Sequence, residues 1–351
     1  MKNNLAIYGC GAFGKIFLEA CEDKVDFFID DFSTQSQYNG IAIKKLVDID
    51  KNTKILISVL QSSKIIEEDL KNKGFSNILS FANSIKLLPK FLNILSKRNY
   101  LWLVEDKKRL LDIEKLNLFK TFLKDIKSVD LLEKIVNFRK TFDMKYYIEP
   151  YDSEYFPSDV PIFNNVSQVN FIDCGAYTGD TINDLMNYCS NVNYCLSFEP
   201  DLKNLENLNN RLESLMNIYP NTNFFVYPAG VYSSNKILSF SNQGIDSSAS
   251  LVNSSDIKIP VVSLDTIILN ANPNYIKMDI EGAEKEAIYG AEKTIKKHKP
   301  NLAICLYHKP EDLWEIPLLI NEIEPNYDMY LRVHEDMCLS TVLYCIAKNK
   351  D

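Results

Sequence analysis

Asp173, Gly175, Gly179 and Glu199 are the residues whose types and spacing could bind a cofactor. The first three lie in the segment 171–181 (FIDCGAYTGDT), which predicts a short apolar strand, a glycine turn and the start of a helix. Gly175 and Gly179 would let the backbone approach a ligand closely, and free amides at the helix start would face its polar groups. Glu199 ends the next predicted strand, 194–198, where an acid can accept hydrogen bonds from both hydroxyls of a ribose. The spacing Asp-x-Gly-x-x-x-Gly-Asp therefore predicts a nucleotide-type cofactor cradle that differs from the dinucleotide pattern.

Other predicted strands end in residues that would face the same edge of a sheet. Strand 224–227 is followed by Gly230, and strand 275–278 by Asp279 and Glu281. In a doubly wound sheet, ligands bind outside the carboxyl ends of the strands. Asp279 could equally cap a following helix, and Glu281 could be a first-turn acid favoured by the helix dipole. Ser248 lies in a serine-rich loop that could hold a nucleotide base or the second substrate, although serine clusters are also ordinary in loops.

The N-terminal region carries a separate glycine pattern. The predicted strand 5–8 is followed by Gly9, Gly11, Gly14 and a helix, and the predicted strand 25–29 ends at Asp30. This is a full Gly-x-Gly-x-x-Gly in a strand–turn–helix setting, with an acid after the second strand. It predicts a site for a nucleotide, a nucleotide sugar or NAD. A Rossmann-like scaffold that needs the glycines only for tight packing would explain the pattern equally well.

The order of elements predicts an α/β protein with two doubly wound, Rossmann-like domains joined by a helical segment. Residues 1–85 alternate strands and helices and form the first domain. Residues 86–165 combine helix-spaced apolar residues with an aromatic stretch, and we take them as a helical linker and entrance loop. Residues 166–351 form the second domain, with one helix over 283–299 and two last strands, 328–333 and 341–347, that have no helix between them.

Composition and charge exclude several classes of protein. A chain of 351 residues suits two domains, and a net charge of −8 argues against a nucleic-acid partner. The eight cysteines are scattered without a Cys-x-x-Cys pair, which predicts reduced thiols in a cytoplasmic protein. We find no signal-peptide layout and no apolar run of about 18 residues, so we expect neither secretion nor a membrane span. The helical linker could form a homo-oligomer interface.

Five segments of the second domain together resemble the FkbM family of S-adenosylmethionine-dependent methyltransferases. They are 171–181, 198–200 (FEP), 263–267 (SLDTI), 276–284 (IKMDIEGAE) and 306–314 (LYHKPEDLW), in order and suitably spaced. The resemblance covers residues 140–348 and implies a class I methyltransferase fold, for which an antiparallel last pair of strands is typical. Members often act on hydroxyls of sugars, polyketides or glycans. The first domain is similar to the nucleotide-sugar-binding segment of some bacterial sugar acyltransferases, through Ile-Tyr-Gly at 7–9 and Phe-Ile-Asp-Asp at 28–31.

The FkbM resemblance implies a set of cofactor-binding positions. Glu199 would take the ribose of S-adenosylmethionine, and Asp279 would lie near the sulfonium and the acceptor hydroxyl. Gly230 and Ser248 are assigned to the cofactor as well. The methionine portion would be lined by Asp173, Gly175, Thr178, Gly179, Asp180 and Thr181.

The resulting hypothesis is an O-methyltransferase acting on a hydroxyl of a sugar, a nucleotide sugar or a surface glycan. A sugar hydroxyl is a weak nucleophile, so we expect a base; His308 ranks first because its ordinary pKa suits the task, and Asp279 and Glu281 follow. These three residues could instead hold Mg²⁺, although nothing in their spacing demands a metal. The alternative is an NAD- or nucleotide-sugar-dependent enzyme, or a sensor, that uses the N-terminal glycine motif.

Overall fold

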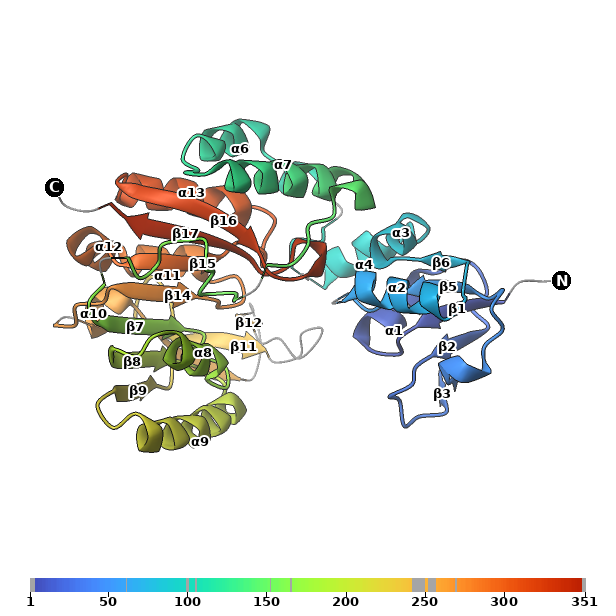
Figure 1. Cartoon of the computed structure of the whole chain (residues 1–351), viewed down its shortest axis with the longest axis horizontal. Helices are drawn as coiled ribbons and strands as arrows, with labels where there is room; N and C mark the ends of the chain where they lie inside the picture. Colours follow the sequence, from blue (N-terminus) through green and yellow to red (C-terminus); the bar gives the residue numbers. More distant parts are fainter. Residues whose placement is uncertain are drawn as a thin grey trace. The chain divides into compact units, whose positions relative to one another are not determined.

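The computed structural model describes residues 4–60, 62–98, 101–104, 106–151, 153–164, 166–241, 250–251, 257–268 and 270–348. The chain forms two compact units (Figure 1). The first comprises Met1–Leu110, Leu131–Pro150 and Glu335–Leu339, and the second comprises Leu111–Asp130, Tyr151–His334 and Ser340–Asp351. The sequence predicted that residues 86–165 form a separate linker and entrance loop. In the structure these residues are divided between the two units.

The first unit is built on a six-stranded sheet in the order β3-β4-β2-β1-β5-β6. Its strands are β1 (Leu5–Tyr8), β2 (Phe27–Ile29), β3 (Gln37–Tyr38), β4 (Ile41–Lys44), β5 (Lys54–Ile57) and β6 (Ile78–Leu79). Strand β3 is antiparallel to β4, and the other neighbours are parallel. The parallel βαβ arrangement predicted for residues 1–85 is confirmed.

Helices α1 (Ala12–Ala20), α2 (Ser63–Asn72), α3 (Phe81–Lys86) and α4 (Phe91–Lys97) belong to this unit. Phe13 and Phe17 of α1 pack with Phe81 and Phe91, with ring centroids 5.2–6.3 Å apart. These buried rings tie α1, which follows the glycine turn, to the helices after β6. The helix-spaced apolar residues beyond them form α5 (Lys107–Leu110), α6 (Ile113–Lys120) and α7 (Ile126–Thr141).

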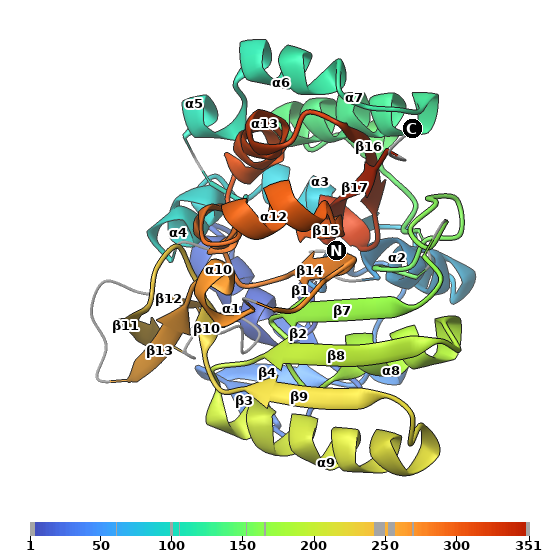
Figure 2. The ribbon, with the colours of Figure 1, turned by 90° about the vertical axis from the view of Figure 1, so that its left-hand side faces the viewer.

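The second unit contains a seven-stranded sheet in the order β16-β17-β15-β14-β7-β8-β9 (Figure 2). The strands are β7 (Val169–Cys174), β8 (Val192–Phe198), β9 (Asn223–Tyr227), β14 (Tyr275–Met278), β15 (Asn301–Cys305), β16 (Tyr327–Val333) and β17 (Thr341–Ala347). Strands β15, β14, β7, β8 and β9 are parallel, and β17 is antiparallel to both neighbours, as expected for the last two strands. Consecutive residues Phe171 and Ile172 are both fully buried, so both faces of β7 are covered.

Helices α8 (Asp180–Tyr188), α9 (Leu202–Ile218), α10 (Leu264–Ile267), α11 (Glu284–Tyr289), α12 (Glu292–His298) and α13 (Asp312–Ile323) connect these strands. The prediction of a single helix over 283–299 is wrong, because the chain forms two helices, α11 and α12, with a break at Gly290. The Asp265 carboxylate accepts hydrogen bonds from the amides of Lys293 and Thr294 and so caps α12. A Cβ on Gly290 would lie 2.0 Å from the carbonyl oxygen of Tyr232, so this close approach requires glycine.

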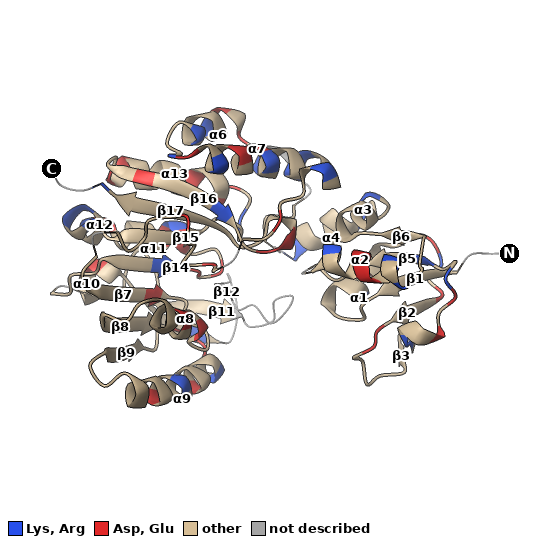
Figure 3. Cartoon of the chain, viewed as in Figure 1, with Lys and Arg blue, Asp and Glu red and all other residues tan. Residues whose placement is uncertain are grey.

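A small second sheet follows β9, in the order β10-β13-β11-β12. It is formed by β10 (Gly230–Val231), β11 (Lys236–Ser241), β12 (Ser250–Leu251) and β13 (Lys258–Val262). Phe240, Ile259 and Val261 form its buried cluster. Lys, Arg, Asp and Glu are interspersed along α6, α7 and α9 (Figure 3). None of the described helices combines the length and the apolar composition needed to cross a bilayer.

Candidate active site

A cavity of about 320 Å³ opens at the carboxyl ends of β7, β8 and β14 in the second unit. It lies where ligands bind in doubly wound sheets. Of the residues predicted from the sequence, it is lined by Gly175, Asp180, Thr181, Glu199, Gly230, Asp279 and Glu281. Further lining residues include Glu154, Tyr155, Tyr177, Phe198, Asn204, Phe240, Ile259, Val261, Lys277 and Ile280. One cavity thus brings together residues from most of the predicted strand ends.

The glycine turn after β7 has the geometry that its sequence predicts. Gly175 and Gly179 have φ of +84° and +81°, a region that side chains disfavour. A Cβ on Gly175 would lie 1.9 Å from the carbonyl oxygen of Asp279, so glycine also allows β7 and β14 to end side by side. Gly179 is the N-cap residue of α8, whose first turn carries Asp180. The turn therefore presents backbone and the start of α8 to the cavity.

Glu199 lies at the end of β8, is almost fully buried and faces the cavity. Its carboxylate accepts hydrogen bonds from the amides of Tyr177 (2.9 Å) and Asp201 (2.8 Å). Burial raises the pKa of the Glu199 carboxyl, and these amide hydrogen bonds oppose the rise. Oε2 accepts the Tyr177 amide and has a further lone pair for a ligand hydroxyl, whereas Oε1 accepts the Asp201 amide and, at 3.5 Å, the side-chain amide of Asn204. Glu199 is thereby held rigidly between the glycine turn and the start of α9.

Asp173 and Lys277 form a buried ion pair beneath the glycine turn. Asp173 is fully buried, does not line the cavity, and lies 3.1 Å from Lys277 Nζ. Burial raises the pKa of Asp173 to about 6, opposed by the Lys277 ammonium. Lys277 Nζ also donates a hydrogen bond to the Gly175 carbonyl at 2.7 Å. The pair fixes the turn from below, and Asp173 lies beneath the residues that line the cavity.

Asp279 is surrounded by hydrogen-bond donors. Tyr155 Oη donates to Asp279 Oδ2 at 2.9 Å, and Tyr307 Oη donates to Oδ1 at 3.3 Å. His308 Nε2 lies 3.3 Å from Oδ1. Burial would raise the pKa of Asp279, but the positive charges of Lys277 and His308 and these donors lower it below its usual range. Asp279 is therefore a firmly ionised carboxylate at the cavity wall.

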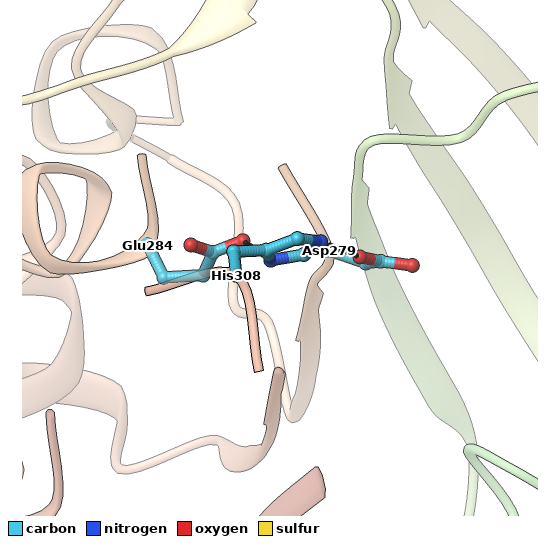
Figure 4. Close-up of side chains that lie close together, drawn as sticks. All are labelled: Asp279, Glu284 and His308. Carbon is cyan, nitrogen blue, oxygen red and sulfur yellow. Dashed lines mark ion pairs between the residues drawn. The ribbon is translucent and has the colours of Figure 1, made fainter. Parts of the chain in front are cut away.

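His308 lies behind Asp279, between two carboxylates. Figure 4 shows its imidazole between Glu284 and Asp279, and its Nδ1 lies 2.9 Å from Glu284 Oε1. Glu284 is fully buried, and the side chain of His308 is only 3% exposed. Burial lowers the pKa of His308, but Glu284, Glu281 and Asp279 raise it to about 10. The imidazole is therefore protonated at neutral pH, and it does not line the cavity.

Glu281 faces the cavity in an unusual backbone conformation. Its φ is +55°, and the following residue, Gly282, has φ of +92°. Its side chain is 34% exposed, and Oε2 lies 3.7 Å from His308 Nε2. Burial raises the pKa of the Glu281 carboxyl to about 7, although His308 opposes the rise. Strained backbone of this kind often occurs at functional sites.

Asp279, Glu284 and His308 each offer one ligand atom within 4.8 Å of one another, the spacing of a potential metal site. The donor set fits Mg²⁺ poorly, because that ion prefers an all-oxygen octahedral shell that keeps several waters. Both imidazole nitrogens face carboxylates, and the imidazolium already supplies a positive charge between them. We therefore give Mg²⁺ no part in the reaction proposed below.

The remaining predicted positions lie apart from this arrangement. Thr178 is partly buried and does not line the cavity, and Ser248 lies outside the described residues. In the first unit, the Asp30 carboxylate accepts hydrogen bonds from the amides of Cys10, Phe32 and Ser33. A Cβ on Gly14 would lie 2.1 Å from the Gly9 carbonyl oxygen, which accounts for that glycine by close packing, whereas a Cβ on Gly11 would meet nothing within 4 Å. The N-terminal nucleotide site stays a prediction.

Sequence reasoning missed Lys277, Tyr155, Tyr307 and the role of Glu284. A lysine inside the otherwise apolar strand 275–278 was a signal for a buried ion pair. Tyr155 belongs to the aromatic stretch that was assigned to the entrance, but nothing in its spacing indicates a bond to Asp279. Glu284 reads as a first-turn acid of α11, and its contact with His308 is set by the packing of two separate strand ends.

The sheet order, the antiparallel last pair of strands and the cavity at the parallel strand ends define a Rossmann-like methyltransferase fold. Residues 173–334 match the family model described as the methyltransferase FkbM domain. The FkbM resemblance of the second domain is thereby confirmed, and the family match supports a methyltransferase. The acyltransferase-like resemblance of the first domain stays a prediction.

One solved structure shares the fold over nearly the whole chain. The crystal structure of methyltransferase FkbM from Methylobacillus flagellatus matches with a TM-score of 0.68 and 24% identity, covering 98% of this chain and 90% of that chain. An rRNA methylase from Streptococcus thermophilus matches with a TM-score of 0.32 and 11% identity, covering 52% of this chain and 88% of that chain. A comparison with curated proteins found no match. The first similarity extends over both units, and at this identity it shows the fold.

Proposed function

We propose that the second unit is an S-adenosylmethionine-dependent O-methyltransferase that acts on a hydroxyl of a sugar, a nucleotide sugar or a surface glycan. The observation that carries the proposal is Glu199, a buried carboxylate held at the end of β8 and facing the cavity beside the glycine turn. An acid in this position binds the ribose hydroxyls of a nucleotide-type cofactor.

Eight free cysteines support the cytoplasmic location expected from the sequence.

The residues around the cavity fit this cofactor. Glu199 would bind the ribose, Gly175 and the start of α8 would bind the methionine portion, and Gly230 would lie against the adenosine. The carboxylates around the cavity suit a ligand with a net positive charge. Bound S-adenosylmethionine supplies a methyl group that its sulfonium already activates for transfer. The protein then has to orient the acceptor and remove its proton.

We assign the removal of the proton to Glu281. It is exposed to the cavity, and its pKa of about 7 suits a base that works near neutral pH. In the proposed step, the acceptor oxygen would take the methyl group that the sulfonium supplies, and the donor would leave as its neutral thioether. The hydroxyl proton passes to the Glu281 carboxylate. His308, which ranked first from the sequence, already carries its proton at this pH.

Asp279 and His308 then have positioning and electrostatic roles. Tyr155, Tyr307 and His308 hold the Asp279 carboxylate in one orientation, from which it can accept a hydrogen bond from the acceptor. Glu284 holds His308 from its other side. The imidazolium lies 3.7 Å from Glu281 and stabilises the ionised form of that base.

Calorimetric titration with S-adenosylmethionine tests the proposal. The protein should bind it, and Glu199→Ala should weaken binding at least tenfold because the ribose hydroxyls lose their acceptor. Glu206→Ala removes an exposed acid of α9 and serves as the control, with unchanged affinity expected. An unchanged affinity in Glu199→Ala would remove Glu199 from the site, and no binding by the wild-type protein would overturn the proposal as a whole.

A further inference from the structure

The cavity divides into a cofactor side and an acceptor end. The cofactor side is formed by the ends of β7, β8 and the start of β10. The acceptor end is formed by β14 and the turn after it, by β11 and β13 of the small sheet, and by the segment before β7. Its charged residues are Glu154, Lys277, Asp279 and Glu281, which are three acids and one base. The acceptor therefore meets carboxylates and apolar surface.

Two buried cations, Lys277 at this end and His308 behind Asp279, are already paired. Lys277 Nζ lies 3.1 Å from Asp173 and donates to the Gly175 carbonyl. His308 lies among Glu284, Asp279 and Glu281, at 2.9, 3.3 and 3.7 Å. Both side chains are 3% exposed, so neither can turn toward an incoming ligand without leaving a buried carboxylate unpaired.

The acidic acceptor end is rigidly built. The Glu154 carbonyl accepts a hydrogen bond from Tyr344, and the Tyr155 carbonyl accepts one from Tyr275. Both tyrosines are buried in the core of the unit.

We infer that the group entering the acceptor end is an uncharged polyhydroxy compound or a cationic amine, and that a phosphate or carboxylate beside the reacting hydroxyl is excluded. This rests on the proposed methyl transfer and narrows its substrate class. Like charges in a partly desolvated site repel strongly, and no free cation among the described lining residues offsets them. A nucleotide sugar fits only if its diphosphate stays outside the cavity.

The apolar part of the acceptor end agrees with this class. Phe240 and Ile280 line the same cavity as the carboxylates, which offers apolar surface for ring carbons and acceptors for ring hydroxyls. Carboxylates that accept hydrogen bonds from hydroxyls need no counter-charge on the ligand. An anionic ligand would have to displace or protonate them.

The test is a binding measurement on protein loaded with S-adenosylhomocysteine, by saturation-transfer NMR. The probes are methyl glycosides of glucose, galactose and mannose, together with the matching uronic acids, sugar phosphates and amino sugars. We expect the best neutral or amino member to bind at least tenfold more tightly than its anionic counterparts. Equal or tighter binding of an anionic member would overturn the inference, as would the absence of binding by every neutral and amino member.

Charge-reversal variants locate the effect. Glu154→Lys should reduce the ratio of affinities between neutral and anionic probes at least threefold. Glu154→Gln should reduce this ratio less, and it replaces the lysine variant if that variant does not fold. Glu206→Lys makes the same change in net charge on the exposed side of α9 and should leave the ratio unchanged. An unchanged ratio in a folded Glu154 variant contradicts the inference. Calorimetry with S-adenosylhomocysteine is separate, because its failure would reject the proposed cofactor and not the charge of the acceptor.

Discussion

Glu281 and His308 lie 3.7 Å apart, and the pKa of each is raised for a different reason. Burial raises the pKa of Glu281 to about 7. Burial lowers the pKa of His308, but three carboxylates raise it to about 10. Near pH 7 the imidazole therefore keeps its proton while Glu281 exchanges one with the solvent. This distribution of protons makes the glutamate the base and the histidine its positively charged neighbour.

Glu281→Gln should lower kcat by about 10²–10⁴-fold, the usual contribution of a positioned base. In the wild-type protein kcat should rise with pH and reach half its maximum near pH 7, because only the ionised carboxyl accepts a proton. The variant should lose this dependence and keep its affinity for S-adenosylmethionine. Glu292→Gln on α12 is the control, and pH profiles of methyl transfer are the measurement. A variant with wild-type turnover would falsify the assignment.

Glu284→Gln should lower the pKa of His308, because it removes the nearest carboxylate. The folded pKa of His308 lies above its unfolded value of about 6.5, so its stabilising contribution is complete below that pH and is lost as the pH rises through about 10. NMR titration of the imidazole should show the shift directly. At pH 7 the free energy of unfolding of the variant should be lower by about 3–5 kcal/mol, as expected when a buried ion pair loses one partner.

The control for this variant is Glu315→Gln, which breaks the partly exposed pair with Lys285. Exposed ion pairs contribute about 0–1 kcal/mol, so little loss is expected. If both variants lose the same small free energy of unfolding, and the pKa of His308 does not change, the ion pair between Glu284 and His308 does not stabilise the imidazolium.

Residue types at strand ends were enough to predict which residues meet at one cavity. Gly175, Glu199 and Asp279 each follow a strand directly, so the sheet alone brings them together. The proton state of His308 could not be predicted in this way, because it depends on Glu284, which α11 brings to it across the fold. A histidine with an ordinary pKa looks like a base until its neighbours are known.

At the scale of elements, two strands were predicted with their observed bounds, whereas one predicted helix is divided in the structure. Strands β1 and β17 were predicted residue for residue, because short apolar runs bounded by polar residues define a buried strand. The helix predicted over 283–299 divides because of two distant contacts, the Asp265 cap and the Tyr232 backbone. Neither contact leaves a mark in the local spacing of apolar residues.

Gly290→Ala should destabilise the second unit by about 1–3 kcal/mol, the usual cost of overpacking a close contact. Its φ of −72° is ordinary for alanine, so the effect isolates the clash with the Tyr232 carbonyl. Urea unfolding followed by Trp314, buried in α13 of the second unit, is the measurement. Gly11→Ala, where the new Cβ would meet nothing within 4 Å, is the control and should be close to neutral. Equal stability of Gly290→Ala would show that the two backbones can separate without loss.

At the scale of the whole molecule, the sequence predicts two alternating α/β regions, and the structure contains two such units. Their extents could not be read from the order of elements, because Glu335–Leu339 joins the first unit from between β16 and β17 of the second. A segment of five residues between two strands has no local pattern that assigns it to a distant region. The division between units is set by tertiary contacts.

The two units should respond to different ligands. Each contains one of the two tryptophans, Trp102 in the first and Trp314 in the second, and both are buried. S-adenosylhomocysteine at about 100 times its Kd should stabilise the unit that binds it by about 2.7 kcal/mol. We expect the unfolding transition seen by Trp314 to move and that seen by Trp102 to stay, with Trp→Phe variants separating the two signals. A nucleotide sugar or NAD that moves the Trp102 transition alone would place a second ligand in the N-terminal glycine motif. Equal movement of both transitions with S-adenosylhomocysteine would instead show that the units unfold together.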